Sequence, residues 1–243
     1  MRIRSITVGT NVDYPRGAAG FRAFDAFQAE ARARFELAGL EVQTVRLATQ
    51  PFPEVLRQHG PSSTAQFARE LERLCLAHGI DYCSIGTVVA THPDDDLSFI
   101  DAIPDAIRQT EAAFASVLVA KRGSGIHLQA IRRAAQAIAE VAHVEATGFG
   151  NLRLAILANC EAGSPFFPAA FHRGSETRFA VATESADIAV DSFARATTLQ
   201  EARENLIGLV EERAGVIQGV CRELEETHGL RFGGIDFSLA PFP

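Results

Sequence analysis

The chain has 243 residues, 47% of them hydrophobic and 22% charged, a balance typical of globular proteins with a packed core. Its 23 Lys and Arg residues against 30 Asp and Glu residues leave a formal net charge of −7. This charge repels nucleic-acid backbones and anionic membrane surfaces, so we expect neither of them as a partner.

The sequence contains no run of about 18 apolar residues, the length of a membrane-spanning helix. The segment Met1 to Ser5 lacks the apolar core of a secretory signal. We therefore expect a cytoplasmic protein. The cysteines are scattered and form no CxxC pair, which favours reduced thiols over a disulfide framework or a structural zinc site. They are Cys75, Cys83, Cys160 and Cys221.

Strand and helix patterns alternate along the chain. Apolar alternation predicts a strand at residues 2–8, and Phe21, Phe24 and Phe27 begin an apolar helical face that ends at Gly39. Further strands are predicted at 40–47, 80–89, 115–120, 152–157, 178–183 and 231–237, and further helices at 62–75, 99–112, 127–142 and 199–224. This alternation predicts an α/β fold with mainly parallel strands, in one domain over residues 1–243.

The longest predicted helix contains Gly208, Gly215 and Gly219 on related faces. Each glycine costs about 1 kcal/mol relative to Ala in a helix interior. Either another backbone approaches the helix closely there, or tertiary packing makes the helix tolerant of these glycines.

In parallel α/β folds, ligands bind beyond the carboxyl ends of the strands, where the loops converge. This rule selects the polar residues that follow the predicted strands. They are Asp13, Tyr14, Thr49, His92, Asp94, Asp95, Asp96, Cys160, Glu161, Glu184, Asp187 and Asp236.

The densest polar segment is residues 159–172, in which Cys160, Glu161 and His172 flank a stiff loop rich in Pro and Phe. A thiol becomes a nucleophile or a metal ligand when a nearby cation or a helix terminus lowers its pKa. His172 is the expected partner of Cys160. The alternative is that Cys160 is a small buried hydrophobe at a strand end.

Three carboxylates follow the last predicted strands. Glu184 lies between an apolar strand and a helix start, so its burial calls for a cation, a ligand or an arginine as partner. Asp187 can cap the next helix or bind substrate. Asp236 follows Gly233 and Gly234, which permit close backbone approach to a ligand or form a simple turn.

Two weaker signals remain. His92 with residues 94–96 could bind a divalent cation, or these aspartates could cap the following helix. Residues 121–125, Lys-Arg-Gly-Ser-Gly, could cradle an anion, although they lack the full phosphate-loop pattern.

Several motifs in order resemble the uncharacterised DUF711 (UPF0210) family over nearly the whole chain. They are Val42 to Thr49, Gly148 to Leu152, Asn159 to His172, Glu184 to Asp187, and Gly233 to Pro243. The resemblance implies a fold similar to pyruvate formate-lyase and ribonucleotide reductase, an α/β barrel of ten strands in two parallel halves. This chain would supply one half and the beginning of the other.

Members of the family continue past the motif Ser238 to Pro243. A half barrel leaves an open strand edge and an uncovered apolar face, which predicts a homo-oligomer or a second chain that completes the fold. The glycyl-radical enzymes of this fold need a radical-bearing Gly motif, and no such motif occurs here, so the resemblance does not transfer radical chemistry.

The leading hypothesis is a small-molecule enzyme with its site at the carboxyl ends of the strands. Cys160 would act as nucleophile or ligand and His172 as its base, with Glu184 as a third catalytic group. Substrate contacts would come from Asp236, Glu161, Asp187 and Thr49, and no cofactor is assigned. The alternatives are a non-catalytic binding or assembly module and, more weakly, a divalent-metal enzyme that uses His92.

Overall fold

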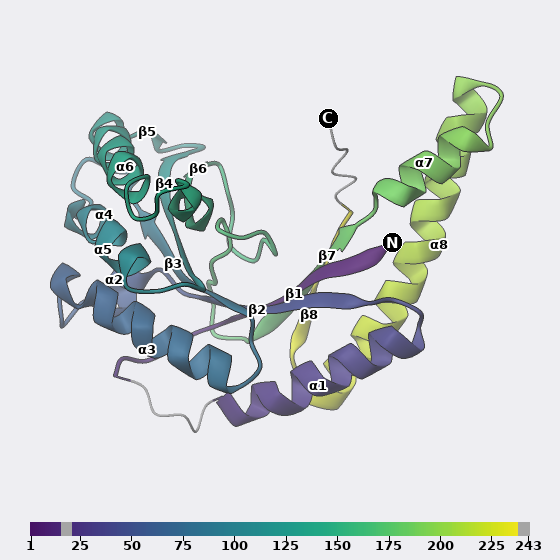
Figure 1. The fold of residues 1–243 in the computed structure, drawn as a ribbon, viewed down its shortest axis with the longest axis horizontal. Helices are drawn as coiled ribbons and strands as arrows, with labels where there is room; N and C mark the ends of the chain where they lie inside the picture. The colour runs from purple at the N-terminus through teal and green to yellow at the C-terminus, as the bar shows by residue number, and fades with distance from the viewer. Residues whose placement is uncertain (16–20, 238–243) are drawn as a thin grey trace.

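One sheet organises the protein in a computed structural model that describes residues 1–15 and 21–237. Within these residues the sheet has eight strands in the order β5-β4-β3-β2-β1-β7-β8, with β6 beside β4 (Figure 1). The strands are β1 (Arg2–Thr10), β2 (Val42–Thr49), β3 (Tyr82–Val89), β4 (Ala113–Lys121), β5 (Gly125–Ile126), β6 (Leu154–Ala158), β7 (Arg178–Glu184) and β8 (Arg231–Asp236).

The strands fall into two groups that run in opposite directions. β6, β4, β3, β2 and β1 are mutually parallel neighbours. β7 then pairs antiparallel with β1, and β8 pairs parallel with β7. The α/β fold with mainly parallel strands is confirmed, and the two opposed groups of strands are consistent with a barrel-like fold.

The helices connect these strands. They are α1 (Arg22–Leu37), α2 (Phe52–Val55), η2 (Pro61–Ser63), α3 (Thr64–Ala77), α4 (Ser98–Asp101), α5 (Ile103–Arg108), α6 (Leu128–Val141), η3 (Phe149–Arg153), α7 (Ala186–Ala194) and α8 (Leu199–His228). None of the helices in the described part of the chain combines the length and the apolar character needed to cross a membrane.

The single helix predicted at 99–112 is wrong, because α4 and α5 are separate and α5 ends at Arg108. Pro104 lies in the first turn of α5. Proline has no backbone N–H to continue the hydrogen bonds of a preceding turn, so it favours a new helix start. At the C-terminal end of α5, Thr110 lies beyond the helix, and its side-chain hydroxyl donates to the carbonyl of Ala106 at 2.8 Å.

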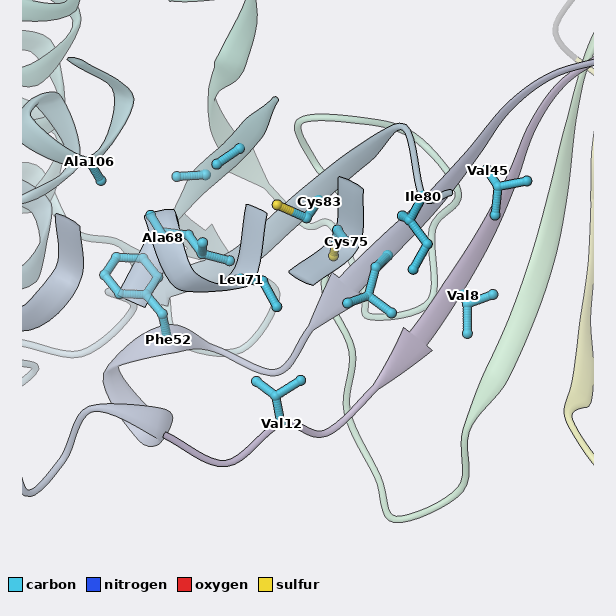
Figure 2. Packing of buried hydrophobic residues seen from close by; sticks show 14 of the residues in the cluster. Val8, Val12, Val45, Phe52, Ala68, Leu71, Cys75, Ile80, Cys83 and Ala106 are labelled. Carbon is cyan, nitrogen blue, oxygen red and sulfur yellow. The ribbon is translucent and has the colours of Figure 1, made fainter. Parts of the chain in front are cut away.

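The face of the sheet toward α1, α3 and α5 is apolar and forms the core. Alternate strand residues such as Val8 and Val45 are buried there with Leu71 and Cys75 of α3 (Figure 2). Cys75 lies close to Cys83 of β3, and the pKa of the Cys83 thiol is raised by the hydrogen bond with Cys75 and by burial. Both thiols are free and buried in the core.

The opposite face of the sheet is polar and is covered by the segment 159–177, which joins β6 to β7. The Thr7 hydroxyl donates to the carbonyl of Pro165 at 2.9 Å, and the Ser84 hydroxyl donates to that of Ala170 at 2.7 Å. The Arg46 guanidinium lies over the ring of Phe167 at 5.4 Å. We call this segment the crossing loop.

α7 and α8 extend from the sheet as a helical arm (Figure 1). A Cβ added at Gly208, Gly215 or Gly219 would meet no described atom within 4 Å. Of the two alternatives, a close backbone approach is not found among the described residues, and the glycines are tolerated in a helix whose contacts with α1, α7 and β8 hold it in place.

Candidate functional site

The carboxyl ends of β1, β2, β3, β4 and β6 lie at one edge of the sheet, because these strands are parallel. The crossing loop starts at this edge, after β6, and crosses it to reach β7. It carries Cys160 and His172, and the backbone N–H of His172 donates to the carbonyl of Thr49 at 2.9 Å. The structure therefore brings Thr49, Cys160, Glu161 and His172 to the same edge.

The prediction of one shared edge is wrong for Glu184, Asp187 and Asp236. β7 runs antiparallel to β1, so its last residue, Glu184, pairs with Arg2 at the start of β1. Asp236 ends β8 at the same side, opposite Ala182 of β7. The pattern of a strand does not reveal its direction, and the sequence therefore assigned these carboxylates to the wrong end.

At that opposite edge, the side chains of Glu184 and Asp187 bind other residues of the protein. The Gln43 amide donates to the Glu184 carboxylate at 2.9 Å, so its partner is an amide rather than the cation, ligand or arginine that we expected. The Asp187 carboxylate accepts from the amino group of Met1. Burial by itself raises the pKa of Asp187, but the hydrogen bond and charge of the Met1 amino group, together with the backbone N–H groups of Asp187 and Ile188, make the net shift downward.

His172 is the most constrained polar side chain of the crossing loop. It is 2% exposed, and its Nε2 lies 3.1 Å from the carbonyl oxygen of Gly174. A carbonyl can only accept, so Nε2 carries the proton and Nδ1 keeps its lone pair. Burial lowers the pKa of His172, and the charge of Arg178 lowers it further. The imidazole is therefore neutral at pH 7, with an acceptor nitrogen.

The position of the imidazole depends on Gly9. A Cβ on Gly9 would lie 2.9 Å from His172 Nδ1 and 3.4 Å from its Cγ. The distance to Nδ1 is shorter than a Cβ atom tolerates, so a side chain at residue 9 would have to displace the ring. The absence of a side chain on β1 thus creates the place that His172 occupies.

His172 borders a pocket of about 100 Å³. Gly9 and Thr7 of β1 form one wall, Ser164 of the crossing loop forms another, and Arg178 supplies a cation. Because liquid water occupies about 30 Å³ per molecule, this pocket has room for about three waters or one small functional group. It can hold the reacting end of a small molecule.

Cys160 borders a different pocket, of about 330 Å³, and only Phe171 lines both. In the described part of the chain no hydrogen bond joins Cys160 to His172. The Cys160 thiol instead donates weakly to the carbonyl of Glu161 at 3.8 Å. Burial raises the pKa of this thiol, and the Glu161 carboxylate raises it further, so the thiol is protonated at neutral pH. The predicted Cys–His pair is not found.

Glu161 and Thr49 differ in what they offer a ligand. Glu161 lies at the rim of the larger pocket, 3.4 Å from the Lys121 ammonium. Thr49 is 0% exposed, and its hydroxyl donates to the carbonyls of Gln50 and Ser84. Its own carbonyl holds the His172 backbone. Thr49 therefore positions the crossing loop and His172, while Glu161 remains accessible.

The aspartates that follow β3 serve the backbone. Asp95 accepts from the N–H groups of Thr91 and His92 at 2.7 and 2.8 Å, and Asp96 accepts from that of Ser98 at 2.9 Å. Among the described residues, no group of three or more His, Cys, Asp or Glu side chains is arranged to hold a metal ion. Asp95 therefore holds the turn after β3, and only Asp96 reaches the first residue of α4.

Arg178 is the site residue that the sequence did not single out. It was predicted as the start of a strand, and the start of an antiparallel strand lies beside the ends of parallel ones: Arg178 pairs with Gly9. Only knowledge of the strand direction could have placed it in the pocket. The closing motif Ser238 to Pro243 lies outside the residues that the structure describes.

Comparison with known proteins identifies relatives across archaea and bacteria. A family model described as "Uncharacterised ACR (DUF711)" matches residues 1–243. A UPF0210 protein from Methanopyrus kandleri is 30% identical over 220 residues, which cover 84% of this chain and 48% of that protein. A UPF0210 protein from Neisseria meningitidis serogroup A is 24% identical over 212 residues, which cover 84% of this chain and 47% of that protein.

A UPF0210 protein from Pyrobaculum islandicum is 28% identical over 216 residues, which cover 84% of this chain and 46% of that protein. The chain thus spans about half the length of these relatives. The match of the family model over every residue confirms the resemblance that the sequence motifs indicated, and the chain belongs to the DUF711 family of uncharacterised proteins.

Proposed function

We propose that this chain provides the reaction pocket of a small-molecule enzyme in which His172 accepts a proton from the substrate. The observation that carries the proposal is a buried, neutral imidazole that lines a pocket and whose Nε2 is anchored on Gly174, which leaves Nδ1 as the acceptor nitrogen. A general base needs this combination of correct protonation state and fixed orientation.

The chemistry follows from the two charged or basic groups in the pocket. Nδ1 takes a proton from a substrate O–H, N–H or activated C–H, and the electron pair of that bond stays on the substrate. The Arg178 guanidinium lines the same pocket and stabilises the negative charge that develops there. The imidazolium so formed returns its proton to the product, which restores the starting state.

The other predicted residues take different places in this proposal. Glu161 contacts substrate at the rim of the larger pocket, and the protonated thiol of Cys160 faces the same space as a donor. Thr49 is a positioning residue, and Glu184, Asp187 and Asp236 stabilise the opposite end of the fold. The chain acts as one α/β domain of a longer family fold, in the cytoplasm, without a nucleic-acid or membrane partner.

The test is substrate turnover from a defined mixture of purified small metabolites, followed by mass spectrometry. Wild type and the exposed-residue control His143→Gln should convert the same compound, and His172→Gln should not. Gln keeps a donor for Gly174 but accepts no proton near pH 7. If no compound is converted, or if His172→Gln retains wild-type turnover, the proposed role of His172 is wrong.

A second candidate function is assembly with another copy of this chain, and the exposed apolar side chains of the helical arm favour it. Val190 is 65% exposed and Phe193 57% exposed on α7. We propose that two copies pack through this helix. Light scattering should report a dimer that Phe193→Ser disrupts and that Leu76→Ser, a change at an exposed residue of α3, preserves. A wild-type monomer would contradict this candidate.

A further inference from the structure

A second pocket lies at the same edge of the sheet, around Cys160, and it is not used by the proton transfer. Its volume is about 330 Å³, and it is lined by residues that follow β3, β4 and β6. A pocket of this size accommodates a small organic ligand. We call it the cationic pocket, for the reason given next.

Three cations line this pocket, Lys121, Arg122 and Arg173, against one carboxylate, Glu161. The chain as a whole carries a net charge of −7, so the sign of the charge here is opposite to that of the protein. Cations gathered on a concave, partly desolvated surface attract anions more strongly than the same charges on an open surface. The excess of positive charge in the pocket therefore favours negatively charged ligands over neutral or cationic ones.

The pairing of these cations leaves capacity for a ligand. Lys121 lies 3.4 Å from Glu161, and Arg173 lies 3.6 Å from Glu54. Among the described residues Arg122 has no ion-pair partner. Asp95, which lies beside His92, directs one carboxylate oxygen to two backbone N–H groups, and no ion pair joins it to Arg122 in the described part of the chain. At least one guanidinium is thus free to bind an anion.

Local hydrogen bonds hold the residues of this pocket in place. The Arg122 backbone N–H donates to the Asn159 side chain at 2.6 Å, which ties the end of β4 to the end of β6. Ser124 Oγ lies 3.3 Å from His92 Nε2, which ties the same turn to the end of β3. Ser124 and His92 also line the pocket, so they add uncharged hydrogen-bonding groups beside the cations.

We propose that the cationic pocket binds the anionic group, a phosphate or a carboxylate, of the small molecule on which the enzyme acts. Arg122 and Arg173 hold the anion, with Ser124 as a further donor. Phe171 lines both this pocket and that of His172, so the two pockets are neighbours, and in this proposal the rest of the bound molecule reaches the imidazole. The anion site stands on its own contacts, and only its link to catalysis rests on the proposed function.

Calorimetric titration of the full chain at constant ionic strength tests the anion site directly. Inorganic phosphate and succinate are the two probes, and they distinguish a phosphate ligand from a carboxylate ligand. At least one of them should bind wild type. Arg122→Gln and Arg173→Gln should each weaken that binding about tenfold, because each removes charge-assisted hydrogen bonds to the anion.

Two control variants keep the outcomes separate. Arg108→Gln removes an exposed arginine of α5 that pairs with Asp105 outside the pocket, and it should bind the probe as wild type does. His172→Gln should also bind it normally, since His172 does not line the cationic pocket. Absence of binding by both probes, or an equal loss in Arg108→Gln and Arg122→Gln, would overturn the anion site.

The result also separates this inference from the proposed function. If Arg122→Gln weakens anion binding while His172→Gln leaves turnover unchanged, the anion site stands and the catalytic role of His172 fails. If neither anion binds while His172→Gln abolishes turnover, the reaction pocket stands and the anion site fails.

Discussion

Replacing Gly9 with Ala tests whether the imidazole of His172 is held where the structure places it. The added Cβ would lie 2.9 Å from Nδ1, and the ring cannot simply swing away. The backbone N–H of His172 donates to the carbonyl of Thr49, and its ring Nε2 donates to the carbonyl of Gly174. The substitution must therefore displace the ring, break one of these bonds or shift β1.

The expected cost follows from this geometry. Overpacking of a well-packed site costs about 1–3 kcal/mol in the free energy of unfolding. At about 2–4 °C per kcal/mol for a chain of this size, Gly9→Ala should lower Tm by about 2–12 °C. The nitrogen resonances of the His172 ring should shift as well, because the hydrogen bond to Gly174 changes.

Urea denaturation and NMR of the histidine rings measure both effects. Gly208→Ala on α8 is the matched control, because no described atom lies within 4 Å of the added Cβ. In a helix interior this change should raise the free energy of unfolding by about 0.5–1 kcal/mol. If Gly9→Ala unfolds at the wild-type urea concentration and the His172 resonances do not move, the close contact is wrong.

Three further predictions concern pH, the thiol and a buried arginine. Burial lowers the pKa of His172 from 6.5, so as pH falls the unfolded chain binds a proton before the folded chain does. Wild type should therefore lose stability relative to His172→Gln below pH 6.5. If the urea midpoints of the two proteins differ by the same amount at pH 8 and at pH 5, this prediction is contradicted. Iodoacetamide should modify Cys160 more slowly than free cysteine at pH 7, and faster as pH rises, because its thiol is protonated; Cys160→Ser identifies the labelled site. Arg153→Met should lower the free energy of unfolding by about 1–3 kcal/mol, because the Thr110 carbonyl, bonded at 2.7 Å, loses its donor; Arg108→Met at the surface should change it by less than about 0.5 kcal/mol, and equal effects would refute the role of Arg153.

Local patterns predicted the individual elements well where burial on one face decided them. The helix around Phe67 and Leu71 and the strand around Val45 follow the expected periodicity, and both enter the core. Prediction failed at Pro104, where a missing N–H divides the helix although the apolar spacing continues through it. Apolar spacing alone does not report where the backbone hydrogen bonds stop.

The candidate site was also predicted in part and missed in part. The motif rich in Pro and Phe did indicate the crossing loop, and His172 is held at the predicted edge. Its partner was expected to be Cys160, yet the contacts it makes are with Gly9, Thr49 and Gly174. Thr49 was predicted to contact substrate and instead holds the His172 backbone, whereas Gly9 and Gly174 have no side chain that a search for chemistry in the sequence could select.

The sequence by itself determined the class of the fold, the extent of most strands and helices, and the family. These properties depend on which residues each segment buries, and that is set within the segment. Only the tertiary structure decided that β7 reverses direction, which moves Glu184 away from His172 and brings Arg178 to it. A strand buries the same alternate residues whichever way it runs, so its direction emerges only when it pairs with a neighbour.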